Sequence, residues 1–317
     1  MRLHLLSRQP KRLGEPRLPG DGEHGGAGGQ AGLWRDQVYP LPLVTLLCPV
    51  RHCATPLERQ ARSLVCSRGH SFDLARSGYC NLLQPQDRRS RQPGDPKEAV
   101  EARRRLLDAG YGAALLRALK EEVDALDLRP GAAVLDVGCG EGYYLGALAG
   151  RGGIEAHGLD LSVPAVDLAA RRHPGIPWIV ANADRFLPYA AGSFDVVLSL
   201  DARLPASEIL RVMAPEGRLL VAVPAPDDLV ELRAAVLGEG VLRDRLARAA
   251  ERLAGDFALE ERRTVRQTAR LDAAALRDAL AATYRGARQS RQARLEAIPE
   301  MAVTLAHDLA VFRGLPG

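Results

Sequence analysis

The stretch VLDVGCGEGYYLGAL, residues 134–148, decides which fold this sequence predicts. An apolar run ends at Asp136, a turn with Gly138, Gly140 and Gly142 follows, and a helix is expected after it. Glycine has no Cβ, so these positions allow the backbone to approach a ligand closely. Dinucleotide-binding folds use G-x-G-x-x-G to hold a pyrophosphate. The spacing here is G-x-G-x-G, so a pyrophosphate cradle is not required.

Acidic residues follow the next two apolar runs. In HGLDLS, Asp160 stands at a strand end 24 residues after Asp136, where a carboxylate can accept both ribose hydroxyls of a nucleoside. The alternative for Asp160 is a helix N-cap, a role for which Ser162 competes. In ANADRFLP, Asp184 is a candidate acceptor for an adenine amino group, with a turn aspartate as the alternative.

Strands and helices alternate from about Gly112 to Pro226, which predicts a parallel sheet with helices on both faces. The strand candidates are 132–138, 154–162, 177–183, 194–200 and 217–223, and helical runs include 163–173 and 205–213. Beyond Pro226 we expect helices over 228–255, a strand over 257–271, a helix over 272–283 and a strand over 300–314. With its glycine loop, this α/β region resembles class I (Rossmann-like) S-adenosylmethionine methyltransferases, whose loop contacts the amino-acid part of the cofactor.

The chain has 317 residues, a net charge of +4 and five cysteines, and no apolar run approaches the length of a membrane span. An odd number of cysteines without export features favours metal binding or free thiols, and a cytoplasmic location. Residues 1–43 carry six of the Lys/Arg and four of the Asp/Glu residues, and glycine is dense in them, so we predict a disordered tail. Global charge is thus a weak indicator of nucleic-acid binding.

The stretch CPVRHCATPLERQARSLVCSRGH, residues 48–70, has the ligand types and spacing of a structural zinc site. The candidate ligands are Cys48, Cys53, Cys66 and His70, and His52 is an alternative to Cys53. Four protein ligands leave no position for a catalytic water, so the metal would serve folding. Cys80 is expected to be buried packing. The sequence therefore predicts a zinc-binding module over 44–83, to which the family resemblance described below adds a role in RNA recognition.

An arginine-rich linker and a helix are expected over 84–111, followed by a methyltransferase domain with a C-terminal extension over 112–317. Arg88, Arg89 and Arg91 suit phosphate contacts, although any one arginine can equally be a solvated surface charge. Arg103, Arg104 and Arg105 are expected on the polar face of the helix. Tyr143 or Tyr144 could stack on a base or pack against the sheet.

The zinc knuckle, FDLARSGYCNLLQPQDRRSRQPGD, ARRRLLDAGYG and LDVGCGEGYY together resemble the RlmA family, which includes TlrB-like enzymes. These are 23S rRNA (guanine-N1)-methyltransferases, some of which confer resistance to tylosin-type macrolides. The resemblance implies zinc ligands at the four positions above and cofactor contacts at Gly140 and Glu141. It also implies contacts near Tyr111 and Asp228, where this sequence departs from the family's pattern, as it does with Arg51 in the first knuckle.

Methylation at guanine N1 requires removal of the N1 proton, which a nearby carboxylate can accept. Asp201, which follows the fourth strand, is the candidate, with a surface-turn aspartate as the alternative. The expected partner is 23S rRNA or the large ribosomal subunit, and the C-terminal helices could form a homodimer. Two rival functions are a methyltransferase for a small molecule or protein and a non-enzymatic ribosome-binding factor.

Overall fold

The computed structural model describes residues 44–88, 90, 92–150, 153–237, 242–283 and 294–316. The tail predicted over 1–43 and two of the candidate RNA-binding residues, Arg89 and Arg91, lie outside these ranges. Among the helices of the described ranges, none is long and apolar enough to cross a membrane.

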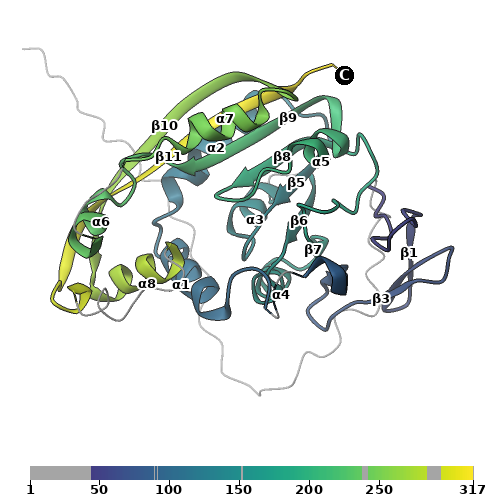
Figure 1. Cartoon of the computed structure of the whole chain (residues 1–317), viewed down its shortest axis with the longest axis horizontal. Coiled ribbons are helices and arrows are strands. Elements are labelled where there is room, and N and C mark those ends of the chain that lie inside the picture. Colours follow the sequence, from purple (N-terminus) through teal and green to yellow (C-terminus); the bar gives the residue numbers. More distant parts are fainter. Residues whose placement is uncertain are drawn as a thin grey trace, which may run out of the picture. The chain divides into compact units, whose positions relative to one another are not determined.

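An eight-stranded sheet forms the centre of the described chain, in the order β10-β11-β9-β8-β5-β6-β7-β4 (Figure 1). Neighbouring strands from β4 to β9 are parallel, whereas β11 is antiparallel to both β9 and β10. The strands are β4 (Cys80–Asn81), β5 (Ala133–Val137), β6 (Glu155–Asp160), β7 (Trp178–Val180), β8 (Phe194–Leu200), β9 (Met213–Pro224), β10 (Phe257–Asp272) and β11 (Glu300–Gly314). The predicted α/β class is confirmed, but β4 was missed because two residues carry no readable alternation.

Helices cover both faces of the sheet because its strands alternate apolar side chains between two hydrophobic clusters. On β5 and β8, Val134 and Val196 belong to one cluster, and Leu135 and Val197 belong to the other. The first cluster includes α2 (Ala113–Ala125), α3 (Tyr143–Ala149) and α4 (Val163–Arg172), and the second includes α5 (Ala206–Val212) and α7 (Arg245–Leu253). The carboxyl ends of the parallel strands therefore lie at one edge, between two helical layers.

The C-terminal extension adds a third hydrophobic cluster at the far end of β10 and β11. It is formed with α6 (Val230–Leu237) and α8 (Ala273–Thr283). Figure 1 shows α1 (Lys97–Asp108) beside α8, and Arg105 of α1 donates two hydrogen bonds, of 2.8 and 2.6 Å, to the carboxylate of Asp278. In the helical region expected over 228–255, the described residues 228–237 and 242–255 contain the helices α6 and α7.

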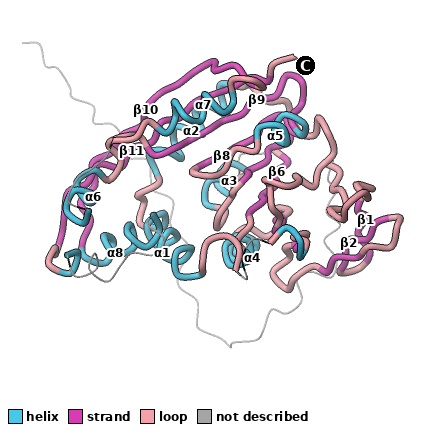
Figure 2. The backbone as a smooth tube through the Cα atoms, viewed as in Figure 1, coloured by secondary structure: helices cyan, strands magenta, loops and turns pink. Residues whose placement is uncertain are grey.

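The N-terminal part of the described chain is a small three-stranded antiparallel sheet, seen in Figure 2 with β1 and β2 labelled. Its strands are β1 (Leu57–Gln60), β2 (Ser63–Cys66) and β3 (Ser71–Asp73), and a short 3-10 helix, η1 (Pro85–Asp87), follows. Val44 and Cys48 share a hydrophobic cluster with Leu135 and Tyr189 of the α/β region. The small sheet is therefore continuous with the large one through a common core and through β4, which pairs with β7.

Candidate active site and metal centre

The glycine loop joins the end of β5 to α3, and its three glycines all have positive φ: 85° at Gly138, 56° at Gly140 and 81° at Gly142. A Cβ at Gly138 would lie 2.4 Å from the Cβ of Ala202, and one at Gly142 would lie 2.7 Å from the ring of Trp178. A Cβ at Gly140 would meet nothing within 4 Å. Packing thus requires two of the glycines, while the third borders open space.

Asp160 is bonded directly to this loop. One carboxylate oxygen accepts a hydrogen bond of 3.0 Å from the backbone N–H of Gly140, and the other accepts one of 2.7 Å from the N–H of Ser162. Burial raises the pKa of Asp160, although these two N–H groups oppose the increase. The N-cap of α4 is Ser162, whose hydroxyl accepts from the N–H of Ala165. The alternative role considered for Asp160 therefore falls to its neighbour, and the carboxylate faces the loop.

Two further carboxyl groups of the loop are buried and only partly bonded. Asp136 and Glu141 are each 2% exposed, and Oδ1 of Asp136 and Oε1 of Glu141 have no hydrogen-bond partner within the described chain. Burial, with the charge of Asp160 as a second cause, raises the pKa of Asp136 to about 8. Buried acceptors without donors are costly, so this pair is suited to a ligand that brings a cationic donor.

Arg103 of α1 reaches the loop region from the other side. Its guanidinium lies 4.0 Å from the Glu141 carboxylate and 3.6 Å from that of Asp201, which directly follows β8. Nε2 of His307, on β11, lies 3.3 Å from the same Asp201 oxygen. Burial alone would raise the pKa of Asp201, but His307 and Arg103 outweigh it and lower the pKa to about 2. Three segments far apart in sequence thus meet at the Asp201 carboxylate.

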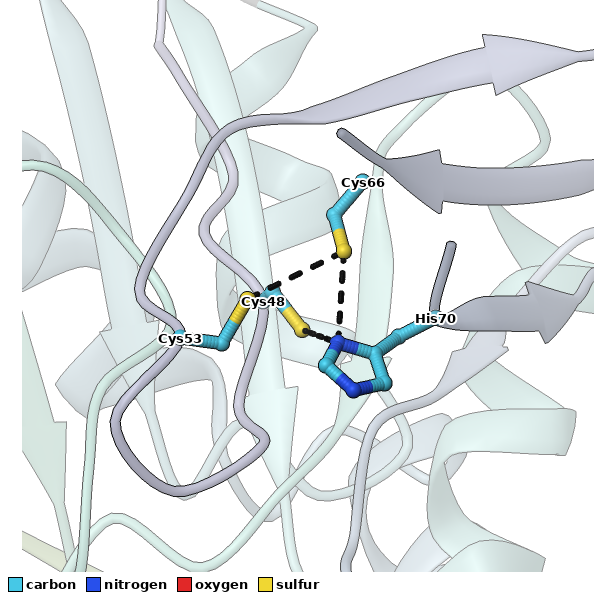
Figure 3. A group of neighbouring side chains, drawn as sticks. All are labelled: Cys48, Cys53, Cys66 and His70. Carbon is cyan, nitrogen blue, oxygen red and sulfur yellow. Dashed lines mark hydrogen bonds between the residues drawn. The ribbon is translucent and has the colours of Figure 1, made fainter. Parts of the chain in front are cut away.

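The predicted metal ligands converge on one point, as Figure 3 shows. The ligand atoms of Cys48, Cys53, Cys66 and His70 all lie within 4.8 Å of one another. Nδ1 of His70 is 3.4 Å from the sulfur of Cys48 and 3.3 Å from that of Cys66, and the sulfurs of Cys53 and Cys66 are 3.8 Å apart. Sulfurs around a tetrahedral zinc ion with Zn–S bonds of about 2.3 Å lie roughly 3.8 Å apart. The four residues therefore fit zinc.

Cys53, not His52, completes this group. His52 is exposed, and its positive φ of 61° belongs to the turn that presents Cys53 inward. Burial would raise the pKa of Cys66, but backbone N–H groups of the 66–70 turn and the side chains of Thr55 and His70 outweigh it and lower the pKa to about 6. The turn thus favours the thiolate, which is the form that binds metal. Cys80 is 1% exposed in β4 and outside the group.

Comparison with known proteins gives two family matches that agree with this geometry. Residues 46–91 match the model described as RlmA, N-terminal, and residues 134–217 match the model described as Methyltransferase domain. A Streptomyces fradiae protein named 23S rRNA (guanine(748)-N(1))-methyltransferase is 39% identical over 236 residues, covering 73% of this chain and 81% of that protein. The chain belongs to the RlmA family of 23S rRNA (guanine-N1)-methyltransferases.

Other relatives separate what is particular to the family from what is general. A Bacillus subtilis protein, provisionally named a 23S rRNA (guanine-N1)-methyltransferase, is 35% identical over 59% of this chain and 66% of its own length. A Beutenbergia cavernae demethylmenaquinone methyltransferase is 42% identical, but only over 32% of this chain and 44% of its own length. Residues 134–217 match a model of methyltransferase domains in general, whereas residues 46–91, the zinc ribbon, match a model described for RlmA.

As an RlmA-family methyltransferase, the protein uses S-adenosylmethionine and carries a structural zinc ion, and its residues fit both groups. The space above Gly140 and the unpaired acceptors of Asp136 and Glu141 suit the cofactor's amino-acid part, whose ammonium group is a donor. The three cysteines and His70 form a closed set of four ligands, which is typical of a structural zinc site.

The remaining cofactor candidates lie in three different places. Asp184 follows β7 and forms an ion pair of 3.1 Å with Arg203. Asp228 is buried and accepts a hydrogen bond of 2.9 Å from the N–H of Ala306, next to His307. The hydroxyl of Tyr111 donates to the carbonyl of Arg270 at 3.3 Å, and its ring packs against the third hydrophobic cluster. Tyr111 therefore contacts β10. Asp228 is bonded to the residue before His307, which is the histidine that contacts Asp201.

The arginine-rich linker starts beside the loop that follows β7. Asn182 donates a hydrogen bond of 2.9 Å to the backbone carbonyl of Asp87, and the guanidinium of Arg185 lies 4.0 Å from the side-chain carboxylate of Asp87. Arg88 comes directly after Asp87 and is exposed. This linker therefore leaves the zinc ribbon at the same edge of the sheet as the glycine loop.

Sequence reasoning missed three residues at this edge. Arg103 was expected on the polar face of α1, but it points to Glu141 and Asp201. His307 was read only as part of a strand. Gly94 packs so tightly on Ser162 that a Cβ there would lie 2.5 Å from its backbone, and Ser162 donates to the carbonyl of Asp95 at 2.7 Å. Only the string PGD in the linker was a signal, because the other contacts join segments with no local pattern in common.

Proposed function

We propose that this protein transfers the methyl group of S-adenosylmethionine to N1 of a guanine in a domain II hairpin loop of 23S rRNA, in the cytoplasm. The observation that carries the proposal is that an RlmA-type zinc ribbon and a methyltransferase loop occur in one chain and share one core. The Streptomyces fradiae relative is named for guanine 748, which makes that position the first to examine.

Different carboxylates near the glycine loop bind different parts of the cofactor. The Asp160 carboxylate keeps acceptor capacity for ribose hydroxyls while it fixes Gly140, because each of its oxygens has a second lone pair. Asp136 and Glu141 accept from the ammonium group, and Asp184 accepts from the adenine amino group. The cofactor supplies an activated methyl group, so the protein's main contribution is to align guanine N1 with it.

The zinc ribbon and the linker bind the RNA in this proposal. Arg88, Arg89 and Arg91 contact phosphates, and the ribbon contributes Arg51 and Arg68. Three of these, Arg51, Arg68 and Arg88, are exposed on the described chain. A base in a hairpin loop can be splayed from its neighbours and enter the site, whereas a base in a duplex is stacked and paired. We therefore divide the chain by role. The ribbon over 44–83 and the linker over 84–111 bind RNA, and the domain over 112–317 is catalytic.

Methylation of RNA fragments tests the proposal directly. Purified protein with radiolabelled S-adenosylmethionine should label a 23S domain II transcript, and mass spectrometry of nuclease fragments should place N1-methylguanine in a hairpin loop. Because a methyl group at N1 blocks Watson–Crick pairing, reverse transcription should stop at that base. Transcripts in which the loop guanines are replaced by adenine are the matched control. Label in the control at the same level would refute the assignment.

One rival function, a methyltransferase for a small molecule, receives specific support from the similarity to a demethylmenaquinone methyltransferase, which covers 32% of this chain. Substitution of Arg88, Arg89 and Arg91 by alanine distinguishes the two readings. An rRNA enzyme should lose most RNA labelling and keep its affinity for S-adenosylhomocysteine. An enzyme for small molecules would be unaffected by these changes.

We also propose that the methylation confers macrolide resistance on the cell and that the protein forms a homodimer. Expression in a tylosin-sensitive strain should raise the inhibitory concentration of tylosin-type macrolides if the methylated guanine borders their binding site. Light scattering should give about twice the 34.2 kDa mass of the chain if it dimerises.

A further inference from the structure

The mechanism above leaves one question open, which is where the proton of guanine N1 goes. Asp201 lies close to the glycine loop, because the next residue, Ala202, packs directly against Gly138. Arg103 and His307 both lie within 4 Å of its Oδ2 atom. A carboxylate that lies beside a guanidinium and accepts a hydrogen bond from an imidazole is a poor proton acceptor. The carboxylate therefore needs a partner that can accept the proton in its place.

We infer that His307 is the catalytic residue that accepts the N1 proton, and that Asp201 is the positioning residue that orients the imidazole of His307. This inference rests on the proposed function. Nε2 of His307 faces Asp201 at 3.3 Å, and the hydrogen bonds of the described chain leave Nδ1 without a partner. With the proton on Nε2 donated to Asp201, Nδ1 presents a lone pair. The side chain is 22% exposed, so an incoming base can reach it.

The step is balanced. The N1–H bond of guanine breaks and its proton forms a bond to Nδ1 of His307, while the electron pair of N1 forms the bond to the methyl carbon. The bond between that carbon and sulfur breaks, and its electron pair stays on sulfur, which becomes a neutral thioether. The positive charge that leaves the sulfonium reappears on the imidazolium, where the Asp201 carboxylate stabilises it. The imidazolium then releases its proton to solvent.

Charges on every element packed against His307 set its protonation. Asp201 follows β8, Asp228 follows β9 and Arg103 comes from α1, while the residues paired with it on β10 and β9 are Val265 and Pro224, which are uncharged. Burial would lower the pKa of His307, but the two carboxylates outweigh it and raise the pKa above 6.5. A raised pKa makes the neutral imidazole a stronger base, but a larger fraction of His307 is then protonated, and unable to accept a proton, near neutral pH.

The test compares His307→Gln, Asp201→Asn and the matched control Asp308→Asn. Asp308 is next to His307 on β11 but on the opposite face of the strand, where it accepts from Thr264. We expect kcat for 23S rRNA methylation to fall about 100-fold or more in His307→Gln, which is the range for loss of a general base. In Asp201→Asn, kcat should fall about tenfold. Asp308→Asn should stay within about twofold of wild type.

Two readouts separate catalysis from structure. The pH profile of wild-type kcat should rise and level off above pH 6.5, that of Asp201→Asn should level off at a lower pH, and that of His307→Gln should have no inflection there. In cofactor-free protein, an NMR titration of the His307 imidazole should show its pKa decreasing in Asp201→Asn. S-adenosylhomocysteine affinity, measured by calorimetry, should be unchanged in His307→Gln.

The outcomes are distinct. If wild-type protein does not methylate 23S rRNA, the proposed function fails and this inference fails with it. If wild type is active and His307→Gln retains its rate, the inference alone is overturned. A larger loss in Asp201→Asn than in His307→Gln, together with a flat pH profile, would assign proton transfer to Asp201. A loss of S-adenosylhomocysteine binding in His307→Gln would assign His307 to cofactor binding.

Discussion

Gly140 is the residue of the glycine loop whose absent side chain borders open space, so its substitution tests cofactor binding without a packing clash. In Gly140→Ala the new Cβ meets nothing within 4 Å, and the φ of 56° costs an L-residue about 1–2 kcal/mol. We expect that modest destabilisation, with a loss of S-adenosylmethionine affinity of at least tenfold, or about 1.4 kcal/mol. Calorimetry and urea unfolding measure the two effects separately.

Gly138→Ala is the matched control for this prediction. Its Cβ would lie 2.4 Å from that of Ala202, so overpacking adds to the cost of a positive φ and the protein should lose about 2–4 kcal/mol of stability. Equal effects of the two substitutions on stability would contradict this difference in packing, and an unchanged S-adenosylmethionine affinity in Gly140→Ala would contradict the assignment of the open space to the cofactor.

Asp201 makes stability depend on pH within a window. Its folded pKa of about 2 is below the ordinary 3.8, so its stabilisation is complete above 3.8 and is lost as the pH falls toward 2. The pKa of His307 is raised above 6.5, so its stabilisation is complete below 6.5 and is lost as the pH rises through the raised value. Urea unfolding of wild type and Asp201→Asn should differ most between about pH 4 and 6.5. A constant difference from acid to alkaline pH would exclude this pairing.

At the scale of single residues, the sequence predicted contacts that are close in the chain and missed those that are distant. The positive-φ glycines and the Cys-x3-His turn are local, so spacing was sufficient to find them. Arg103 and His307 reach Asp201 across about a hundred residues each, and neither lies in a motif. Their periodicity fits a polar helix face and a strand, which is correct as secondary structure but says nothing of what each side chain touches.

Helix α1 shows which forces hold an element in place here. Its Arg105 is 52% exposed and forms a bidentate pair with Asp278 on α8, whereas Leu107 is 8% exposed in the cluster that includes α2 and α3. Exposed ion pairs contribute about 0.2–1 kcal/mol, and burial of a leucine contributes far more. We expect Leu107→Ala to lower the free energy of unfolding by about 2–5 kcal/mol.

Arg105→Ala provides the comparison for α1, with an expected loss of at most about 1 kcal/mol. Chemical unfolding monitored by circular dichroism measures both variants. A larger effect from Arg105→Ala would show that the α1–α8 ion pair, and not burial against α2 and α3, holds the helix.

The order of elements was accessible from sequence because alternation with period 2 and period 3.6 is a local property. The parallel strands β5, β7 and β8 are instead short apolar runs buried on both faces, which is also a local signal. The pairing of β4 with β7 was not accessible, since Cys80–Asn81 is too short to show a period. This strand matters, because it joins the zinc ribbon to the sheet.

At the scale of the whole molecule, the zinc site should affect the stability of more than the ribbon. Cys48, Cys53 and Cys66 are members of the same hydrophobic cluster as Leu135 on β5 and Phe312 on β11. Loss of the ion removes the bonds that hold the three cysteines and His70 together, and the free energy of binding to such a site is part of the folding free energy. We therefore expect chelation to lower the melting temperature of the methyltransferase region together with that of the ribbon, and to abolish RNA methylation.

Two cysteine substitutions make this prediction specific. Cys66→Ala removes a ligand and should reduce bound zinc from one ion per chain to none, as measured by elemental analysis. Cys80→Ala removes an equally buried thiol outside the ligand group, so it should leave a small cavity and keep the ion. If the metal-free Cys66→Ala protein melted like wild type, the shared core would not transmit the loss. If it kept its zinc, another residue would have to complete the tetrahedron, and His52, which adjoins Cys53 in the sequence, would be a candidate.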